Sequence, residues 1–182
     1  MRRFAVFLIP AAFLFGSCRP AAAPVSISNR PATVNDLPVK KPLQEFTWTR
    51  ADGKETSLKD LRGKAVILDF WATYCPPCRD EIPHLNALQA KYSESGLTIV
   101  GLNSGGPEDR PKIPAFLKET PIEYDIAFPD DGLISTVFDS DDRIPQTVVI
   151  NRKGQIVKKI VGFSDQIKME LDAAVQAALS SN

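Results

Sequence analysis

Two cysteines separated by two prolines, Cys75 and Cys78, are the residues of this chain best suited to covalent chemistry. They follow an apolar run and precede a segment with helical periodicity, so Cys75 should lie at a helix N-terminus. Unpaired backbone N–H groups there favour a thiolate and lower the pKa of a cysteine. Cysteines three residues apart on a helix share a face, so one can attack a disulfide and the other can resolve the mixed disulfide. The pattern predicts thiol–disulfide exchange, with Cys75 as nucleophile and Cys78 as resolving thiol.

Other cysteine sites need residues that this pattern lacks. Haem attachment needs a histidine directly after the second cysteine, where Arg79 stands, and a zinc ribbon needs a second cysteine pair. A purely structural disulfide is an alternative, although so small a loop removes little entropy from the unfolded chain. A metal-binding chaperone that uses both cysteines with His84, the one histidine, is another. We expect His84 instead to face solvent on the helix, and we predict no metal site.

Asp69 is the one charged residue in the apolar run from Ala65 to Trp71. Burial disfavours the charged form of a carboxyl group and raises its pKa, which suits Asp69 to accept the proton of Cys78. The alternative is an aspartate that accepts hydrogen bonds from backbone donors at a strand end. We expect the catalytic role.

The segments that must position these residues alternate between strand and helix patterns. The expected elements, in chain order, are a strand with Phe46 and Trp48, a turn at Asp52-Gly53, a buried strand over 65–71, a helix with Ile82, Leu85, Leu88 and Tyr92 on one face, a buried strand over 97–102, helices near 113–118 and 133–138, a hairpin of strands 147–150 and 156–161, and a last helix carrying Ile167, Leu171, Ala174, Val175 and Ala178. This order predicts the α/β class, with a central mixed β-sheet flanked by helices and an N-terminal β extension.

Composition excludes some partners. The chain has 182 residues, with 22 basic and 22 acidic side chains, so it lacks the positive field that holds nucleic acid. The length suits one domain, or two at most. We expect a monomer.

The N-terminus has the pattern of a secretory signal. Arg2 and Arg3 precede an apolar run, 4–15, which is too short to span a bilayer. Residues 19–37 are rich in alanine and proline and poor in large apolar side chains, which indicates a flexible tether. We therefore expect a signal peptide over 1–17, a tether over 18–37 and a folded domain over 38–182.

Gly16, Ser17 and Cys18 resemble the lipobox of bacterial lipoproteins, in which the cysteine is acylated and becomes the new N-terminus. Phe15 departs from this pattern, because a smaller aliphatic residue is usual there. The alternative is an ordinary signal cleaved after Ala23. The resemblance implies a membrane-anchored lipoprotein lipidated at Cys18 on the extracytoplasmic, periplasmic side, where a cysteine pair can cycle as a disulfide.

The stretch from Asp69 to Cys78, Asp-Phe-Trp-Ala-Thr-Tyr-Cys-Pro-Pro-Cys, resembles the thioredoxin superfamily. The domain as a whole resembles the exported TlpA/ResA-like thiol–disulfide oxidoreductases. Pro83 matches a helix proline of that family, and Asn151 to Gly154 resembles its turn. Ile144-Pro145, followed by Gln-Thr and an apolar strand, resembles its cis-proline loop. The resemblance implies a thioredoxin-like fold, a cis peptide bond before Pro145, and substrate contacts from the following residues: Trp71, Tyr74, Pro76, Pro77, Ile144 and Pro145.

Three features depart from the family pattern or fit it loosely. Tyr74 stands where a tryptophan is usual. The lysine that accompanies the buried acid in many thioredoxins is missing, with Gly101 at the equivalent position. Some exported members carry a glutamate in the insert after the second central strand, and Glu108 is our candidate for this proton relay.

The resemblance further implies a reductant of disulfides in exported proteins, for example in cytochrome c maturation, recharged by a membrane electron donor of the thiol-reductase type. No cofactor is implied, because the cysteine pair carries both electrons. The rival enzyme class is a thiol peroxidase with antioxidant activity. Those enzymes place a threonine three residues before the reactive cysteine, whereas Thr73 is two before Cys75.

Overall fold

The computed structural model describes residues 45–181. The expected signal peptide over 1–17, the expected lipidation of Cys18 and the expected tether over 18–37 lie outside the described residues, as does the expected start of the domain at residue 38. Within the described part of the chain, no helix is both long enough and apolar enough to cross a bilayer.

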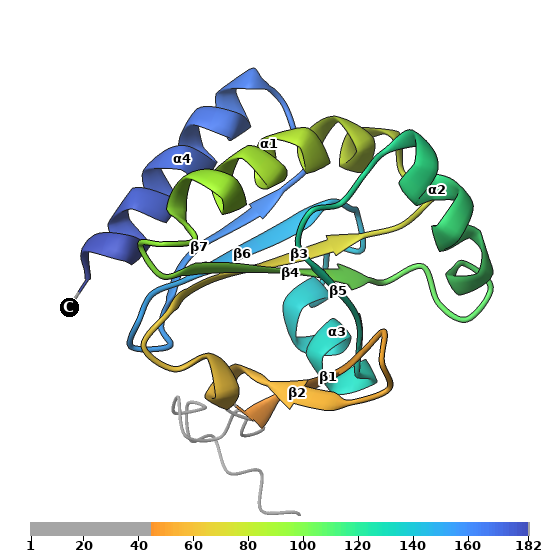
Figure 1. The fold of residues 1–182 in the computed structure, drawn as a ribbon, viewed down its shortest axis with the longest axis horizontal. Coiled ribbons are helices and arrows are strands. Elements are labelled where there is room, and N and C mark those ends of the chain that lie inside the picture. Colours follow the sequence, from red (N-terminus) through yellow and green to blue (C-terminus); the bar gives the residue numbers. More distant parts are fainter. Residues whose placement is uncertain (1–44, 182) are drawn as a thin grey trace, which may run out of the picture. The chain divides into compact units, whose positions relative to one another are not determined.

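A mixed seven-stranded sheet forms the centre of the fold (Figure 1), in the order β2-β1-β5-β4-β3-β6-β7. Its strands are β1 (Thr47–Arg50), β2 (Glu55–Ser57), β3 (Ala65–Trp71), β4 (Leu97–Asn103), β5 (Asp125–Pro129), β6 (Gln146–Ile150) and β7 (Ile156–Val161). The central strand β3 pairs in parallel with β4 and antiparallel with β6. The pair β1–β2 joins the sheet antiparallel to β5, which confirms the N-terminal β extension.

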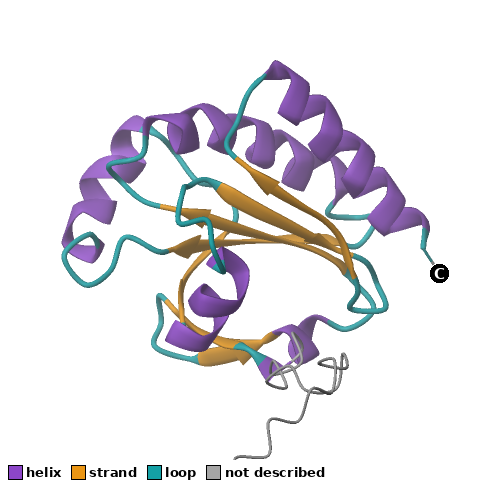
Figure 2. Ribbon diagram, turned by 180° about the vertical axis from the view of Figure 1, so that it is seen from behind, coloured by secondary structure: helices purple, strands orange, loops and turns teal. Residues whose placement is uncertain are grey.

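Helices cover both faces of the sheet (Figure 2). They are α1 (Pro76–Tyr92), α2 (Ile113–Glu119), α3 (Asp131–Phe138) and α4 (Asp165–Ser180), with short 3-10 turns at Leu58–Leu61 and Arg110–Lys112. Alternate residues of β3 face opposite layers, as the pleat requires. Val66 and Phe70 pack in the cluster that contains residues of α3, and Ile67 packs in the cluster that contains residues of α1 and α4. Asp69 therefore lies on the face covered by α1.

Helix α1 is the element that carries the cysteine motif. Cys75 is its N-cap, and Pro76 and Pro77 occupy its first turn, where backbone N–H groups have no intrahelical partner. Pro83 lies inside the helix, at the position expected from the family pattern. The chain then turns through Gly96, whose positive φ of 86° favours glycine, into β4.

Strand β5 is absent from the elements expected from the sequence. It is only five residues long, its burial does not alternate, and it begins and ends with Asp125 and Pro129. It becomes a strand because it pairs with β4 on one side and β1 on the other. Sheet context thus outweighs the local propensity of this segment.

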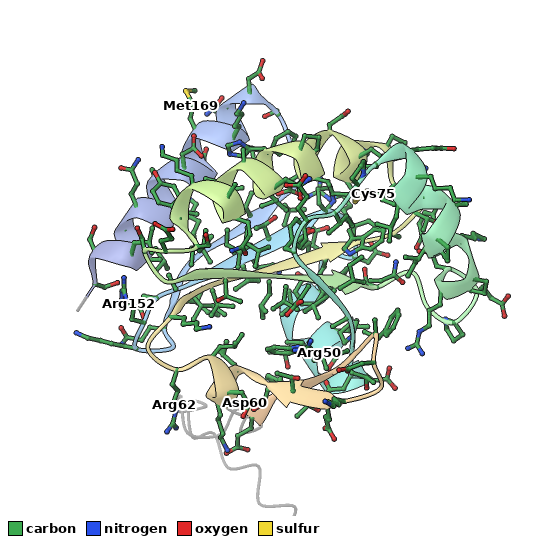
Figure 3. All side chains as sticks on the ribbon, in the orientation of Figure 1. Arg50, Asp60, Arg62, Cys75, Arg152 and Met169 are labelled. Atoms are coloured by element: carbon green, nitrogen blue, oxygen red, sulfur yellow. A yellow bond between two sulfur atoms is a disulfide. The ribbon has the colours of Figure 1, made fainter. Side chains whose placement is uncertain are left out.

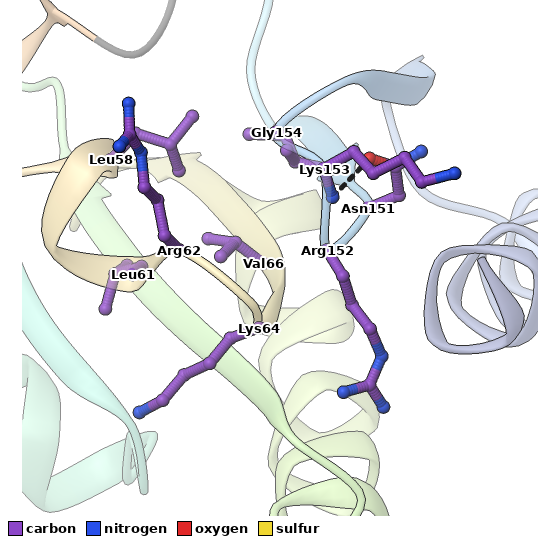
Figure 4. Close-up of a pocket in the computed structure, with 10 residues that line it drawn as sticks. Leu58, Leu61, Arg62, Lys64, Val66, Asn151, Arg152, Lys153 and Gly154 are labelled. Carbon is purple, nitrogen blue, oxygen red and sulfur yellow. Dashed lines mark hydrogen bonds between the residues drawn. The ribbon is translucent and has the colours of Figure 1, made fainter. Parts of the chain in front are cut away.

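The end of the sheet away from the cysteines is held by Arg152 (Figure 3). This residue lies in the β6–β7 turn, and its guanidinium donates hydrogen bonds to the carbonyl oxygens of Gly63, Ser95 and Leu179. Beside it, a small hollow lies between this turn and the segment that leads into β3, and Asn151 Oδ1 accepts a hydrogen bond from the Lys153 backbone there (Figure 4). Arg152 thereby joins the entry to β3, the exit from α1 and the end of α4.

Candidate active site

Cys75 and Cys78 form a disulfide at the start of α1, with 5.3 Å between their Cα atoms. The Cys75 Sγ accepts a hydrogen bond of 3.2 Å from the Cys78 backbone N–H. Because this N–H belongs to the first helical turn, it has no carbonyl partner within the helix, and it would also stabilise a Cys75 thiolate. Both residues are largely buried, Cys75 with 4% and Cys78 with 1% of its surface exposed. The little exposure that the pair retains is mainly on Cys75.

The disulfide packs against apolar side chains of the interior, and exposed residues border its other side. Tyr74 is 64% exposed, whereas Ile144 packs against the cluster that contains both cysteines. The peptide bond between Ile144 and Pro145 is cis, as expected from the family pattern. Trp71, which we expected to contact substrate, is fully buried and packs on the ring of Phe116, with 5.0 Å between the ring centroids. Trp71 therefore supports the site from inside the molecule.

Asp109 holds the segment that leads into the cysteines. Its carboxylate accepts hydrogen bonds from the Thr73 backbone at 2.9 Å, from the Thr73 hydroxyl, and from the Asn103 amide at 2.8 Å. Burial acts to raise the pKa of Asp109, but the hydrogen bonds from Asn103 and Thr73 outweigh it and leave the pKa below its ordinary value. Glu108, the residue expected to act as a proton relay, is exposed. The structure thus joins Asp109, rather than its neighbour Glu108, to the cysteine segment.

Arg79 braces the same segment from the helix. Its guanidinium lies 4.4 Å from the centroid of the Phe116 ring, donates to the Thr73 carbonyl at 3.2 Å and pairs with Glu119 at 3.2 Å. Arg79 therefore connects α1, α2 and the loop before Cys75.

Asp69 is buried between β3 and α1, with 1% of its surface exposed. Its Oδ2 accepts a hydrogen bond of 3.0 Å from the Tyr124 hydroxyl. Burial raises the pKa of Asp69 to about 7, and the hydrogen bond from Tyr124 acts in the opposite direction. A carboxyl group that titrates near neutral pH can both accept and release a proton under working conditions.

Glu81 is a second buried carboxyl group, which sequence reasoning missed. It is 1% exposed, and its Oε1 accepts a hydrogen bond of 2.7 Å from the Thr147 hydroxyl. Burial, followed by the charge of Asp69, raises the pKa of Glu81 well above its ordinary value. The sequence does contain a signal for the burial of Glu81. This residue lies three residues after Cys78 and four before Leu85, and this spacing places it on the buried face of the helix.

The expectation that His84 faces solvent is wrong. Its side chain is only 11% exposed, and its Nε2 lies 2.9 Å from Asp172 Oδ1 of α4. The reason is tertiary, because α4 packs beside α1 and covers this position. Among residues 45–181, no three histidine, cysteine or acidic side chains come together in a way that could hold a metal ion.

Comparisons with known proteins point to one kind of chemistry. A model of the AhpC/TSA family matches residues 39–159. A thiol-disulfide oxidoreductase ResA of Bacillus cereus is 37% identical over an alignment of 145 positions, which covers 77% of this chain and 78% of that protein.

Solved structures agree with this result. A thiol:disulfide interchange protein of the thioredoxin family from Chlorobium tepidum TLS matches with a TM-score of 0.63 and 32% identity, over 78% of this chain and 97% of the other. A secreted Mycobacterium tuberculosis disulfide oxidoreductase, homologous to E. coli DsbE, matches with a TM-score of 0.59 and 25% identity, over 75% and 97%. The thioredoxin-like fold expected from the sequence is confirmed.

Proposed function

This chain belongs to the AhpC/TSA family and is a thiol–disulfide oxidoreductase, and we propose that it acts outside the cytoplasm as a reductant of disulfides in exported proteins. The observation that carries the proposal is the Cys75–Cys78 pair at the N-terminus of α1, with a backbone N–H directed at Cys75 Sγ. The signal-like N-terminus and the likeness to a protein described as secreted support the location.

Cys75 is the proposed nucleophile, because it is the N-cap residue and the more exposed of the two. In the dithiol form, the Cys75 thiolate attacks a substrate disulfide, forming a mixed disulfide and releasing one substrate thiolate, which takes up a proton. The Cys78 thiolate then attacks Cys75 Sγ, releasing the second substrate thiolate. The substrate gains two electrons, and the cysteine pair is left as the disulfide that the structure contains.

Asp69 is the proposed acceptor of the Cys78 proton before the second step. Cys78 is 1% exposed, so water has little access to its thiol and an internal base is needed. The pKa of Asp69, raised by burial to about 7, makes it a stronger base than an exposed aspartate. Glu81, one helical turn after Cys78, joins Asp69 in this buried acidic pair.

The substrate is proposed to lie over the exposed side of the disulfide. Tyr74 and Pro76 are exposed there, and Pro77 and Ile144 are half-buried. Ile144 leads into Pro145, and an extended substrate segment beside them would place its sulfur near Cys75.

The proposed cycle needs a second partner, because each turnover leaves the pair oxidised. We assign this role to a membrane electron donor of the thiol-reductase type. A lipid on Cys18 would hold a monomeric domain near such a donor, and the cysteines of apocytochrome c are a proposed substrate. These assignments rest on the family resemblance of the sequence.

The thiol peroxidase alternative receives no support from the threonine beside the motif. The Thr73 hydroxyl donates its hydrogen bond to Asp109, so that hydrogen is not available to a peroxide bound at Cys75. We therefore retain disulfide exchange as the proposed reaction.

A trapping experiment tests the proposed roles. In the full-length chain, Cys78→Ser should leave Cys75 able to attack and unable to be released, so stable mixed disulfides with exported proteins accumulate and can be identified by mass. Cys75→Ser is the matched control and should trap none. The proposal fails if Cys78→Ser captures nothing, and the order of the cysteines is reversed if only Cys75→Ser captures partners.

A further inference from the structure

We propose that Tyr124 is a positioning residue for the proton acceptor, because its hydroxyl favours the ionised form of Asp69 from a space that Gly101 leaves open. This inference rests on the proposed role of Asp69 in the reaction. It also answers a question raised by the sequence, namely what accompanies the buried acid where many thioredoxins have a lysine.

The space for Tyr124 comes from the strand beside Asp69. Asp69 and Gly101 are register partners in the parallel pair β3–β4, so a side chain at position 101 would lie next to Asp69 on the face covered by α1. A Cβ atom there would lie 2.8 Å from Tyr124 Cε2 and 3.1 Å from Trp71 Nε1. The first distance is shorter than carbon atoms tolerate. The absence of a side chain at Gly101 is therefore what admits the tyrosine ring.

The polarity of Tyr124 suits its position. Tyr124 is 9% exposed and packs in the apolar cluster with Ile67, Leu85 and Ile99. Its hydroxyl lies 3.0 Å from Asp69 Oδ2. Burial, with the charge and hydrogen bond of Asp69 added, raises the pKa of Tyr124 well above its ordinary value. The phenol therefore keeps its proton at working pH and acts as a permanent donor, which stabilises the carboxylate form of Asp69.

The groups around Asp69 explain why the Tyr124 hydroxyl can decide which buried carboxyl group ionises first. The titratable groups that interact with Asp69 are Glu81 from α1 and Tyr124 from the segment before β5. The proposed mechanism adds the Cys78 thiol of α1 in the reduced state. β6 contributes Thr147, the register partner of Asp69, whose hydroxyl binds Glu81. The charges of Asp69 and Glu81 repel each other, and two buried carboxyl groups that interact in this way do not readily ionise together.

The two carboxyl groups differ in their donors. Within the described residues, Asp69 Oδ1 and Glu81 Oε2 accept no hydrogen bond, so the remaining oxygens decide the order of ionisation. Asp69 has the phenol of Tyr124, whereas Glu81 has only the weaker hydroxyl donor of Thr147. Tyr124 thus makes Asp69 the carboxyl group that ionises first, while Glu81 keeps its proton.

Tyr124→Phe tests the inference, because it removes the hydroxyl and keeps the ring. We expect the midpoint of the Asp69 carboxyl titration, followed by carbon-13 NMR on the oxidised protein, to rise by about one pH unit. The pH profile of disulfide exchange by the reduced protein should move upward by the same amount. From a midpoint of about 7, this shift lowers the rate at pH 7 by roughly fivefold and leaves the rate at high pH unchanged. A purely structural role for Tyr124 would lower the rate at every pH.

Tyr92→Phe is the control, since it removes a hydroxyl from a half-buried tyrosine that packs against the same cluster. It should shift neither the titration nor the profile. Gly101→Ala supplies an independent test, because its Cβ must displace the Tyr124 ring and should also raise the Asp69 midpoint. An unchanged Asp69 midpoint in Tyr124→Phe, or in a folded Gly101→Ala, overturns the inference and leaves the proposed exchange reaction intact. If the wild-type protein exchanges no disulfides, the proposed function fails, and the NMR titration still decides the role of Tyr124.

Discussion

At the scale of single residues, the unusual feature is a pair of carboxyl groups inside the fold. Asp69 and Glu81 come from different elements, and each is buried with one hydroxyl hydrogen-bond donor, a phenol for Asp69 and a threonine for Glu81. Burial of such groups costs stability, because the ionised form loses its hydration. A cost of this kind beside a redox-active cysteine pair is characteristic of groups that serve chemistry.

Asp69→Asn should therefore stabilise the protein at high pH. Asp69 ionises near 3.8 when unfolded and at about 7 when folded. Between these two pH values Asp69 is protonated in the folded state and ionised in the unfolded state. The stability that the protonated Asp69 contributes to the wild type is therefore complete below pH 3.8 and is lost as pH rises to about 7. The largest cost, above pH 7, is on the order of 4 kcal/mol. Urea denaturation of the oxidised protein should show the variant as more stable at pH 8, with the difference shrinking toward pH 4.

The control for this measurement is Asp80→Asn, which changes an exposed acid of α1. Its stability should follow the wild type at every pH. Equal free energies of unfolding for Asp69→Asn and wild type at both pH 4 and pH 8 would show that the pKa of Asp69 is not raised in the folded protein.

At the scale of elements, the cysteine pair depends on a loop held from two sides. Asp109 binds Thr73 from the segment after β4, and Arg79 binds the carbonyl of the same residue from α1. Gly105 belongs to this arrangement, because a Cβ there would lie 2.5 Å from Asp109 Oδ2. The glycine-containing insert is thus shaped around the buried carboxylate.

Asp109→Ala should weaken both the fold and the reaction. It leaves buried donors of Thr73 and Asn103 without their acceptor, which should lower the free energy of unfolding by about 2–4 kcal/mol. The loosened segment should also slow disulfide exchange at all pH values. Chemical denaturation and an exchange assay measure the two effects.

Glu108→Ala is the matched control, since the neighbouring side chain is exposed. It should change stability by less than about 0.5 kcal/mol. A shifted pH profile in Glu108→Ala would instead support the proton relay predicted from the sequence, and an unaltered Asp109→Ala would contradict the role given to Asp109.

At the scale of the whole described domain, the reactive end and the structural end of the sheet are separate. The cysteines follow the C-terminal end of β3, whereas Arg152 joins three backbone segments at the opposite end (Figure 3). One of its acceptors is the Leu179 carbonyl near the end of α4, where a cation also complements the helix dipole.

Arg152→Ala should consequently lower stability without altering the chemistry. Losing these three hydrogen bonds should decrease the free energy of unfolding by about 1–3 kcal/mol. Disulfide exchange by the folded protein should keep its rate and pH profile. Lys153→Ala, the adjacent exposed cation, should leave both stability and exchange near wild type. A slowed exchange reaction in folded Arg152→Ala would contradict this separation of roles.

The same division appears between what the sequence predicts and what it does not. The bounds of β3 and the start of α1 follow from an apolar run and a proline-containing cysteine motif, both of which are local signals. The pairing of β5 and the covering of His84 by α4 depend on segments distant in the chain. Local sequence patterns carry no information about those contacts, so they predict neither the strand β5 nor the burial of His84.

The class of reaction and the direction in which the pKa of Asp69 shifts can be predicted from local sequence, because a cysteine pair before a helix and a lone acid in an apolar run are both local signals. The proposed sharing of protons between Asp69 and Glu81, in contrast, depends on contacts between residues distant in the chain. Glu81, Tyr124 and Gly101 come from a helix, a loop and a neighbouring strand. Their effect on Asp69 arises from distances of a few ångströms across the fold, which folding alone creates.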